Sequence, residues 1–426
     1  MSNPHTIAIG TSSSTYRNTR PDPSGPTLLL SPRRSHARSA SHFIYRLRVL
    51  TAIAVDHYRS LRRLRLPLAP ITVVSGANGT GKSNIYRTLR LLSECAHDGV
   101  IAPLAREGGL PSTLWAGRHQ GGGKAPVALR LGFGSDEFSY AIELGLPVPN
   151  GTSMFNRDPE IKAEAIWAGP LLRPATLLVE RRGPTVRVKD PDSRGWTLIH
   201  DSLRPYDSVL SQVVDYQRAP EAVHVREHVR SWRFYDHFRT DSSAPARLGT
   251  VGTRTPVLDN EGASLASAWR TIVEIGDAQG LNEAVETAFP GSQVGVVDVG
   301  GRFELRMQQR GLQRALGAAE LSDGTLRFLL LAVALLSPRP PTLLVLNEPE
   351  TSLHPDLLPA LGQLIARASN ATQLFVVTHA RALIDQVEHA AGKDDLALIE
   401  LTRDQDGTQI IGQEPLDEPA WHFPDR

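Results

Sequence analysis

The chain has 426 residues, of which 41% are hydrophobic and 21% charged, and its formal net charge is +1. This composition is typical of a globular protein with one large or two medium domains. No run approaches the roughly 18 apolar residues that a membrane helix needs, so we expect no membrane partner. The single cysteine, Cys95, excludes an internal disulfide and a cysteine-rich zinc cluster, and the cytoplasm is the expected compartment.

The first ordered elements are expected after an unstructured start. Residues 1–42 are rich in Ser, Arg and Pro without periodicity, which predicts a disordered extension. The alternation from Tyr45 to Leu50 indicates a half-buried strand. The run from Ile71 to Val74 is almost wholly apolar, as in a strand buried in a parallel sheet, and an amphipathic helix over about 82–93 follows it.

The turn between this strand and this helix satisfies the G-x-x-x-x-G-K-[ST] pattern of phosphate-binding loops. Its residues are Gly76, Ala77, Asn78, Gly79, Thr80, Gly81, Lys82 and Ser83. The glycines permit a backbone that turns its N–H groups towards an anion, and the helix aims its positive end at the same place. We expect Lys82 to reach the β- and γ-phosphates of ATP and the Ser83 hydroxyl to bind Mg²⁺.

The middle of the chain, from Gly99 to about Gly317, is rich in Pro and Gly and mixes strands with helices. Strands are predicted over 128–133 and 138–144, helices over 221–232, 262–275 and 281–288, and a hairpin over 293–299 and 303–309. No sustained Pro-free heptad pattern occurs, which excludes a long coiled-coil arm.

An α/β pattern returns after Leu321. Helices are predicted over 324–336 and 355–369, and strands over 343–346, 374–377 and 396–401. The strand over 343–346 ends in Asn347 and Glu348, and we expect it to lie beside the glycine-loop strand. Glu348 is the candidate for polarising an attacking water. Asn347 stands where an aspartate is expected next to Mg²⁺; its amide brings no charge, which predicts weak magnesium retention and slow turnover.

Two further segments have the order and spacing of an ATP site. Ser322 and Gly324, in the sequence LSDGT, open the predicted helix over 324–336 and form a second candidate anion site, although Ser-x-Gly is also a routine helix cap. His379 ends the strand over 374–377, where it either contacts a γ-phosphate or is structural. In the segment 351–355, His354 is as easily explained by packing as by catalysis.

Taken in order, GANGTGKS, LSDGT, LVLNEPETSLHP and VVTH resemble the RecF-like, SMC-related branch of ABC-type ATPases over about 45–402. Val55–Leu61 and Trp232–Asp241 are also similar to segments of that group. The resemblance implies an α/β P-loop NTPase of the ABC type with an inserted α+β lid or arm. Together with the composition of residues 1–42, it predicts four parts: a disordered extension (1–42), the first part of the ATPase (43–145), the inserted region (146–311) and the second part of the ATPase (312–426).

The resemblance also implies an ATP-gated homodimer. Each ATP would lie between Lys82, Ser83, Glu348 and His379 of one copy and Ser322 and Gly324 of the other. Members of the group act on duplex or gapped DNA in gap or double-strand break repair. The role of Trp232–Asp241 is not implied: its aromatic residues suit the core of the lid better than a platform for nucleic-acid bases.

Several alternatives stay open at this point. The long interval between Lys82 and Ser322 disfavours a transporter ATPase, and the segment after His379 is too short for the metal-binding nuclease domain of a related family. An ATPase switch in phage defence or a toxin–antitoxin pair, acting on a partner protein, remains possible. A slow or non-hydrolysing ATP-dependent scaffold is also compatible with Asn347.

Overall fold

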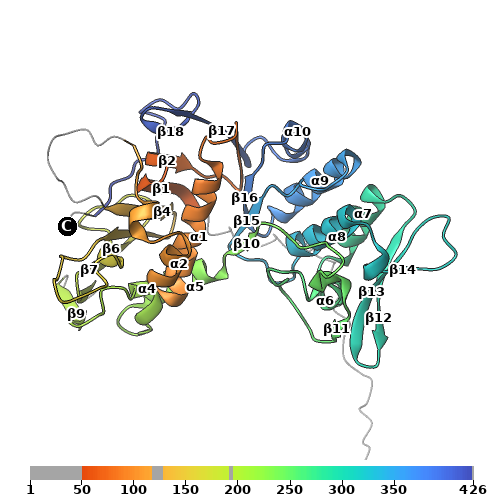
Figure 1. Cartoon of the computed structure of the whole chain (residues 1–426), viewed down its shortest axis with the longest axis horizontal. Helices are drawn as coiled ribbons and strands as arrows, with labels where there is room; N and C mark the ends of the chain where they lie inside the picture. The colour runs from red at the N-terminus through yellow and green to blue at the C-terminus, as the bar shows by residue number, and fades with distance from the viewer. Residues whose placement is uncertain (1–49, 118–127, 191–194, 425–426) are drawn as a thin grey trace, which may run out of the picture. The chain divides into compact units, whose positions relative to one another are not determined.

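The computed structural model describes residues 50–117, 128–190 and 195–424, so the predicted extension 1–42 lies outside the described residues (Figure 1). Their strands form three sheets with the orders β2-β1-β4-β5-β6-β7-β8-β9, β10-β15-β16-β3-β17-β18 and β11-β13-β12, the last extended by β14. Each sheet is described below by the residues that build it.

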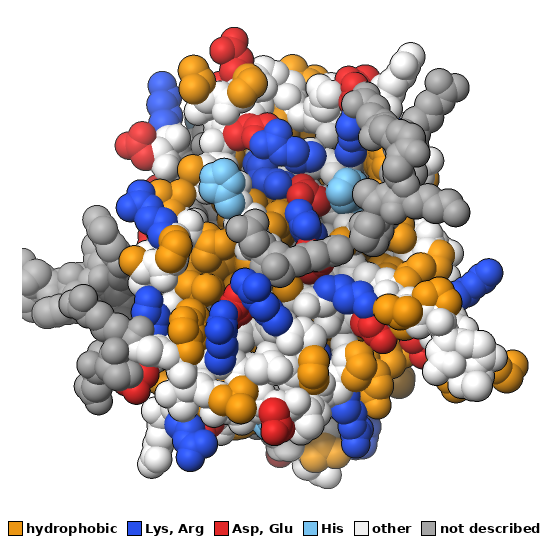
Figure 2. Space-filling model, turned by 90° about the vertical axis from the view of Figure 1, so that its left-hand side faces the viewer, with side chains coloured by type: hydrophobic (Ala, Val, Ile, Leu, Met, Phe, Trp, Pro, Cys, Tyr) orange, Lys and Arg blue, Asp and Glu red, His pale blue; other side chains and the backbone are white. Residues whose placement is uncertain are grey.

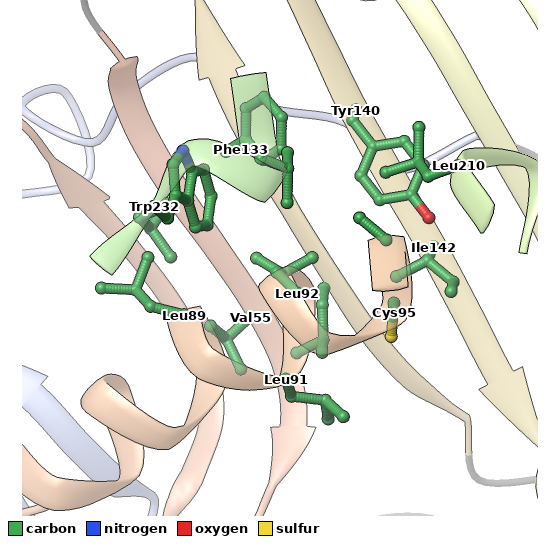
Figure 3. Packing of buried hydrophobic residues seen from close by; sticks show 14 of the residues in the cluster. Val55, Leu89, Leu91, Leu92, Cys95, Phe133, Tyr140, Ile142, Leu210 and Trp232 are labelled. Carbon is green, nitrogen blue, oxygen red and sulfur yellow. The ribbon is translucent and has the colours of Figure 1, made fainter. Parts of the chain in front are cut away.

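The first sheet is antiparallel throughout and comes from the N-terminal half of the described chain. Its strands are β1 (Leu50–Tyr58), β2 (Leu61–Pro67), β4 (Leu129–Ser135), β5 (Phe138–Gly145), β6 (Glu160–Ala168), β7 (Leu177–Arg182), β8 (Thr185–Lys189) and β9 (Trp196–His200). Alternate side chains of β1, β4 and β5 are buried against helix α1 (Lys82–Asp98), because successive residues of a strand face opposite sides. Figure 3 shows Val55, Phe133 and Ile142 from these strands close to Leu92 and Cys95 of α1.

The second sheet has a parallel core that continues into one antiparallel strand. Its strands are β10 (Arg233–Tyr235), β15 (Leu343–Asn347), β16 (Gln373–Val377), β3 (Ile71–Gly76), β17 (Leu396–Asp404) and β18 (Gly407–Ile410). The predicted strands at 71–74, 343–346, 374–377 and 396–401 are therefore confirmed. The expectation that β15 lies beside β3 is wrong: β16 lies between them and pairs with both.

Helices cover both faces of this second sheet. Val345 and Val377 are buried in the same cluster as α1, whereas Leu344 and Val376 are buried with α8 (Asp323–Leu335) and α9 (Leu358–Ala368). The apolar side chains of these strands thus alternate between two apolar layers, which explains the nearly continuous apolar sequence of the strands. The glycine-loop helix α1 and the helix α8 therefore cover opposite faces (Figure 1).

The third sheet contains the predicted hairpin, β12 (Gln293–Val299) with β13 (Arg302–Gln308), together with β11 (Thr250–Val251) and β14 (Leu316–Gly317). Its apolar side chains share a core with α6 (Leu265–Ile275) and α7 (Ala278–Ala288). The other helices are α2 (Ile101–Arg106), α3 (Leu110–Thr113), α4 (Val209–Gln212), α5 (Pro220–Ser231), α10 (Arg381–Ala390) and the 3-10 turns Pro245–Arg247, Ala318–Glu320 and Pro355–Leu357.

The predicted boundary between 145 and 146 falls between β5 and β6, which are paired neighbours in the first sheet. Residues 160–200 thus extend the sheet begun by β1 and β2, and the division into parts at 145 and 311 stays a prediction. Along the described ranges, no helix has the length and apolar character required to cross a bilayer.

Candidate functional site

The candidate site residues gather at one edge of the second sheet. Because β3, β15, β16 and β10 are parallel, their carboxyl ends share this edge. The glycine loop follows β3, Glu348 follows β15 and His379 closely follows β16. A crevice outside the carboxyl ends of parallel strands is where α/β sheets bind ligands.

The glycine loop has the backbone that an anion cradle requires. Gly76, Gly79 and Gly81 have φ values of 144°, 84° and 111°, a region that residues with a Cβ rarely adopt. The buried Nζ of Lys82 donates to the carbonyl oxygens of Gly76 at 2.6 Å and Ala77 at 3.1 Å, so the cation lies against the loop. Gly81 directly precedes α1, which places the positive end of that helix at the loop.

Hydrogen bonds to residues outside the glycine loop support its backbone. The Thr408 hydroxyl in β18 donates to the Thr80 carbonyl oxygen at 2.7 Å and lies 2.9 Å from the Ser60 hydroxyl. Asn84 of α1 donates to the same Ser60 hydroxyl at 2.8 Å. Ser60 belongs to the segment 55–61 that the resemblance singled out, and its position explains why a small hydroxyl residue is needed there.

Glu348 and His379 come together beyond the ends of β15 and β16. Oε1 of Glu348 lies 3.4 Å from Nδ1 of His379, and both side chains are partly exposed, at 43% and 55%. Glu348 has a φ of 47°, which is uncommon for a residue with a side chain, and its backbone N–H donates to the Val377 carbonyl oxygen at 2.8 Å. Strained backbone of this kind costs about 1–3 kcal/mol and is typical of functional sites.

Glu350 is a candidate residue that the sequence analysis missed. Its side chain is 8% exposed, and its Oε1 accepts a 2.5 Å hydrogen bond from the Thr378 hydroxyl and lies 3.7 Å from His379 Nδ1. Its buried Oε2 has no hydrogen-bond partner among the described residues. The signal was present in the sequence, because a second carboxylate follows Glu348 after a single proline.

The donors at this edge fit a magnesium ion bound together with a nucleotide. Ser83 is exposed in the first turn of α1, and Asn347 ends β15. The described residues contain no cluster of three or more His, Cys, Asp or Glu that could hold a metal by itself. Mg²⁺ is usually held by few protein oxygens together with waters and substrate phosphates, and the unpartnered Glu350 Oε2 suits such a water shell.

Ser322 and Gly324 belong to a different surface of the chain. Ser322 caps α8 by accepting from the Thr325 N–H at 3.2 Å, and a Cβ on Gly324 would lie 3.0 Å from the Ser352 carbonyl oxygen. Both line an open hollow of about 600 Å³ whose other walls are Ala288, Phe289, Thr325 and the segment 352–357. None of the residues of the glycine loop lines this hollow.

His354 also lines this hollow, and its side chain is 70% exposed. Its Nδ1 accepts from the Asp356 N–H at 3.3 Å, which caps the turn Pro355–Leu357.

A family model described as "AAA domain, putative AbiEii toxin, Type IV TA system" matches residues 71–385, which include the glycine loop, Glu348 and His379. No curated protein matches the chain in sequence.

Three of the solved structures that match this chain are SMC head domains. One is an SMC head bound to the C-winged helix domain of ScpA, with 14% identity over 85% of this chain and 97% of that chain and a TM-score of 0.48. Another, from Thermotoga maritima, has 16% identity, covers 86% and 99%, and has a TM-score of 0.46. A third, with an extended coiled coil and bound to the C-terminal domain of ScpA derived from Pyrococcus furiosus, has 11% identity, 85% and 95% coverage and a TM-score of 0.43.

The family match spans most of the chain and covers the strand–loop–helix unit that the structure places at the carboxyl edge of the second sheet. The predicted class of P-loop ATPase is confirmed by this family match. This protein belongs to the family of AAA domains described as putative AbiEii toxin, Type IV TA system.

Proposed function

We propose that this protein hydrolyses ATP at a site that two copies complete, and that the ATP-dependent pairing of copies acts on DNA. In this proposal ATP lies on the glycine loop of one copy and meets Ser322 and Gly324 of the other. The observation that carries the proposal is the separation of these two surfaces within one chain. Helices α1 and α8 cover opposite faces of the second sheet, and the hollow at the start of α8 is open and contains no glycine-loop residue.

In the hydrolytic step, Glu348 would accept a proton from the attacking water, and His379 would contact the γ-phosphate. Magnesium, bound through Ser83 and Asn347, would neutralise charge on the phosphates. Because Asn347 is neutral, we propose that hydrolysis is slow and that the paired state is long-lived. The pairing is favoured only while the γ-phosphate is present, so hydrolysis releases it.

For the DNA partner, the support is an arginine-lined hollow of about 660 Å³ on the first sheet. Five of its lining residues are Arg63, Arg65, Arg130, Arg173 and Arg182. On the face drawn in Figure 2, Lys and Arg side chains gather near the centre with Asp and Glu between them. Guanidinium groups suit the bidentate binding of phosphate, and we propose duplex or gapped DNA as the ligand and the repair of gaps or double-strand breaks as the process.

A second candidate function is an ATPase switch that acts on a partner protein in phage defence or a toxin–antitoxin pair. The description of the matching family, which includes a Type IV toxin–antitoxin system, favours this alternative. A third candidate, a scaffold that binds but hardly hydrolyses ATP, is favoured by Asn347. The three candidates share the ATP-dependent pairing and differ in turnover and in the partner.

The test measures the mass of a Glu348→Gln variant in solution with ATP, with ADP and without nucleotide, each with and without duplex and gapped DNA. We expect dimers with ATP alone and more of them with DNA. Monomers under all conditions would refute the composite site, and dimers that DNA neither binds nor stabilises would favour the partner-protein switch. ATPase rates of the parent protein and of Asn347→Asp separate the enzyme from the scaffold.

A further inference from the structure

The segment Trp232–Asp241, called here the linking segment, begins on the nucleotide side of the chain. Its strand β10 pairs with β15, with Tyr235 opposite Leu346. Its Phe234 ring meets the Tyr86 ring of α1 edge to face at 5.7 Å, and Oδ2 of Asp236 accepts a 3.0 Å hydrogen bond from Arg90 of α1. The segment therefore contacts both the strand that carries Glu348 and the helix that follows the glycine loop.

A buried arginine joins the linking segment to Glu348. Arg327 of α8 is 2% exposed; its Nη1 lies 3.1 Å from Nδ1 of His237, and its Nη2 donates to the Glu348 carbonyl oxygen at 3.3 Å. Burial lowers the pKa of Arg327, while the nearby charges of Glu350 and Glu348 raise it. Because Arg327 is a residue of α8, its guanidinium connects the left-handed backbone of Glu348 to the helix that Ser322 caps.

A second arginine joins the end of the linking segment to residues 318–324, called here the signature loop, which contain Ser322 and Gly324 and lead into α8. The side chain of Arg247 is 7% exposed, and it donates to the carbonyl oxygens of Thr240 and Asp241 on one side. On the other side it donates to the carbonyl oxygens of the signature loop, Ala318, Ala319 and Leu321, and to the carboxylate of Asp323 at 2.6 Å. One side chain thus holds two stretches of backbone together.

The contacts of Arg327 and Arg247 add polar connections to the apolar packing of the linking segment. Trp232, Tyr235 and Phe238 of the segment are buried, and Phe234 is partly buried against the cluster that contains α1. A buried guanidinium costs free energy unless its donors are satisfied, and only a planar fork with five N–H groups could serve this many carbonyls at once. The polar groups of the segment therefore connect α1, which follows the glycine loop, to α8 and the loop before it, which carry Ser322 and Gly324.

We infer that the linking segment, through Arg327 and Arg247 as positioning residues, transmits the nucleotide state of the glycine loop and Glu348 to the signature loop of the same subunit. This inference rests on the proposed composite ATP site. A shift of α1 or of Glu348 on nucleotide binding moves the segment, and the segment moves Ser322 and Gly324 into the position that a second copy accepts. Coupling free energies between such sites correspond to about 5- to 150-fold in affinity.

The test uses the full chain with the Glu348→Gln background and compares Arg247→Gln, Arg327→Lys and His237→Phe. We expect ATP affinity to change less than about threefold, while ATP-dependent dimerisation weakens at least about fivefold. The matched control is Arg239→Gln, because this exposed arginine of the same segment hydrogen-bonds to Asp241 and Ser243, within the segment or next to it. Arg247→Lys, which keeps the charge, provides a folded variant if Arg247→Gln is unstable.

A second readout works within one subunit and does not require dimers. In a Ser322→Arg background, ATP should change the amide hydrogen exchange of residues 321–325, and Arg247→Gln or Arg327→Lys should remove that change. Hydrogen exchange of residues 321–325 that is the same with and without ATP would overturn the inference. Variants that dimerise like the parent, or that lose ATP binding and dimerisation together, would also overturn it. Failure of Glu348→Gln to dimerise, with the exchange effect intact, would instead refute the composite site.

Discussion

The hydroxyl of Thr378 donates a 2.5 Å hydrogen bond to Oε1 of Glu350. This bond joins the ends of β15 and β16 and fixes a buried carboxylate whose second oxygen has no hydrogen-bond partner among the described residues. An unpartnered buried oxygen costs free energy, and we propose that a group bound at this edge satisfies it. A water of the magnesium shell or the water that attacks ATP would satisfy it.

Glu350→Gln should therefore leave ATP binding unchanged and lower ATP turnover by about 10- to 100-fold, with a higher Mg²⁺ concentration needed for half-maximal rate. The amide keeps an acceptor for Thr378 but loses the charge. The measurement is ATPase rate against Mg²⁺ concentration. Glu388→Gln, an exposed carboxylate on α10, is the control. A parent-like rate and Mg²⁺ dependence for Glu350→Gln would show that the carboxylate is only structural.

Lys82→Ala should abolish ATP binding, because the loop loses the cation that lies against Gly76 and Ala77. Titration with a fluorescent ATP analogue measures the affinity. Arg87→Ala, an exposed change on the same helix, should bind like the parent and serves as the control. Retained affinity in Lys82→Ala would contradict the assignment of the glycine loop as the nucleotide site.

Ser322→Arg should leave ATP binding intact and prevent ATP-dependent dimerisation, since a large cation would fill the hollow at the start of α8. Analytical ultracentrifugation with ATP in the Glu348→Gln background gives the readout. Ser322→Ala removes the cap to the Thr325 N–H and the bond to the Thr325 hydroxyl, and it should lower the free energy of unfolding by about 1 kcal/mol. Normal dimers of Ser322→Arg would place the partner's contact elsewhere.

DNA affinity, if the arginine-lined hollow is the contact, should fall as salt rises because bound phosphates release counterions. Replacing Arg173 and Arg182 by Gln should reduce the magnitude of the slope of log K against log salt by about 2, roughly 0.9 for each phosphate contact. Fluorescence anisotropy with a labelled duplex measures both quantities. Arg254→Gln, an exposed arginine that does not line the hollow, is the control. A slope that none of these changes alters would argue against this surface.

Asp277, the N-cap of α7, bonds to Arg367 of α9, and we expect its contribution to the free energy of unfolding to depend on pH. A hydrogen bond from Arg367 is the largest cause that lowers the pKa of Asp277, with a further contribution from the Gly280 N–H. Because the folded pKa lies below the ordinary value of about 3.9, the stabilisation is complete above that value and is lost as pH falls through the folded pKa.

Asp277→Ala should therefore lower the free energy of unfolding by about 1 kcal/mol at pH 7, the usual worth of a helix cap, and the difference should shrink below about pH 4. Denaturant unfolding at pH 7 and pH 3 measures it. Asp277→Asn keeps a cap without the charge, and its free energy of unfolding should fall less than that of Asp277→Ala. A difference that persists unchanged at pH 3 would exclude the ionised carboxylate as its source.

By itself, the sequence determined those elements of this protein that local patterns encode. The glycine loop, α1, β15, β16 and the hairpin of β12 and β13 were predicted because each depends on local patterns: glycine spacing, apolar periodicity and turn residues. The order of the motifs then indicated the ATPase class.

Only the tertiary structure decided how these parts meet. It placed β16 between β15 and β3, continued the first sheet through β6 to β9, left an oxygen of Glu350 without a partner and brought Arg327 and Arg247 to the linking segment. Strand order and the contacts of a buried polar group depend on residues far apart in the chain, and local periodicity carries no information about which distant element will supply the partner.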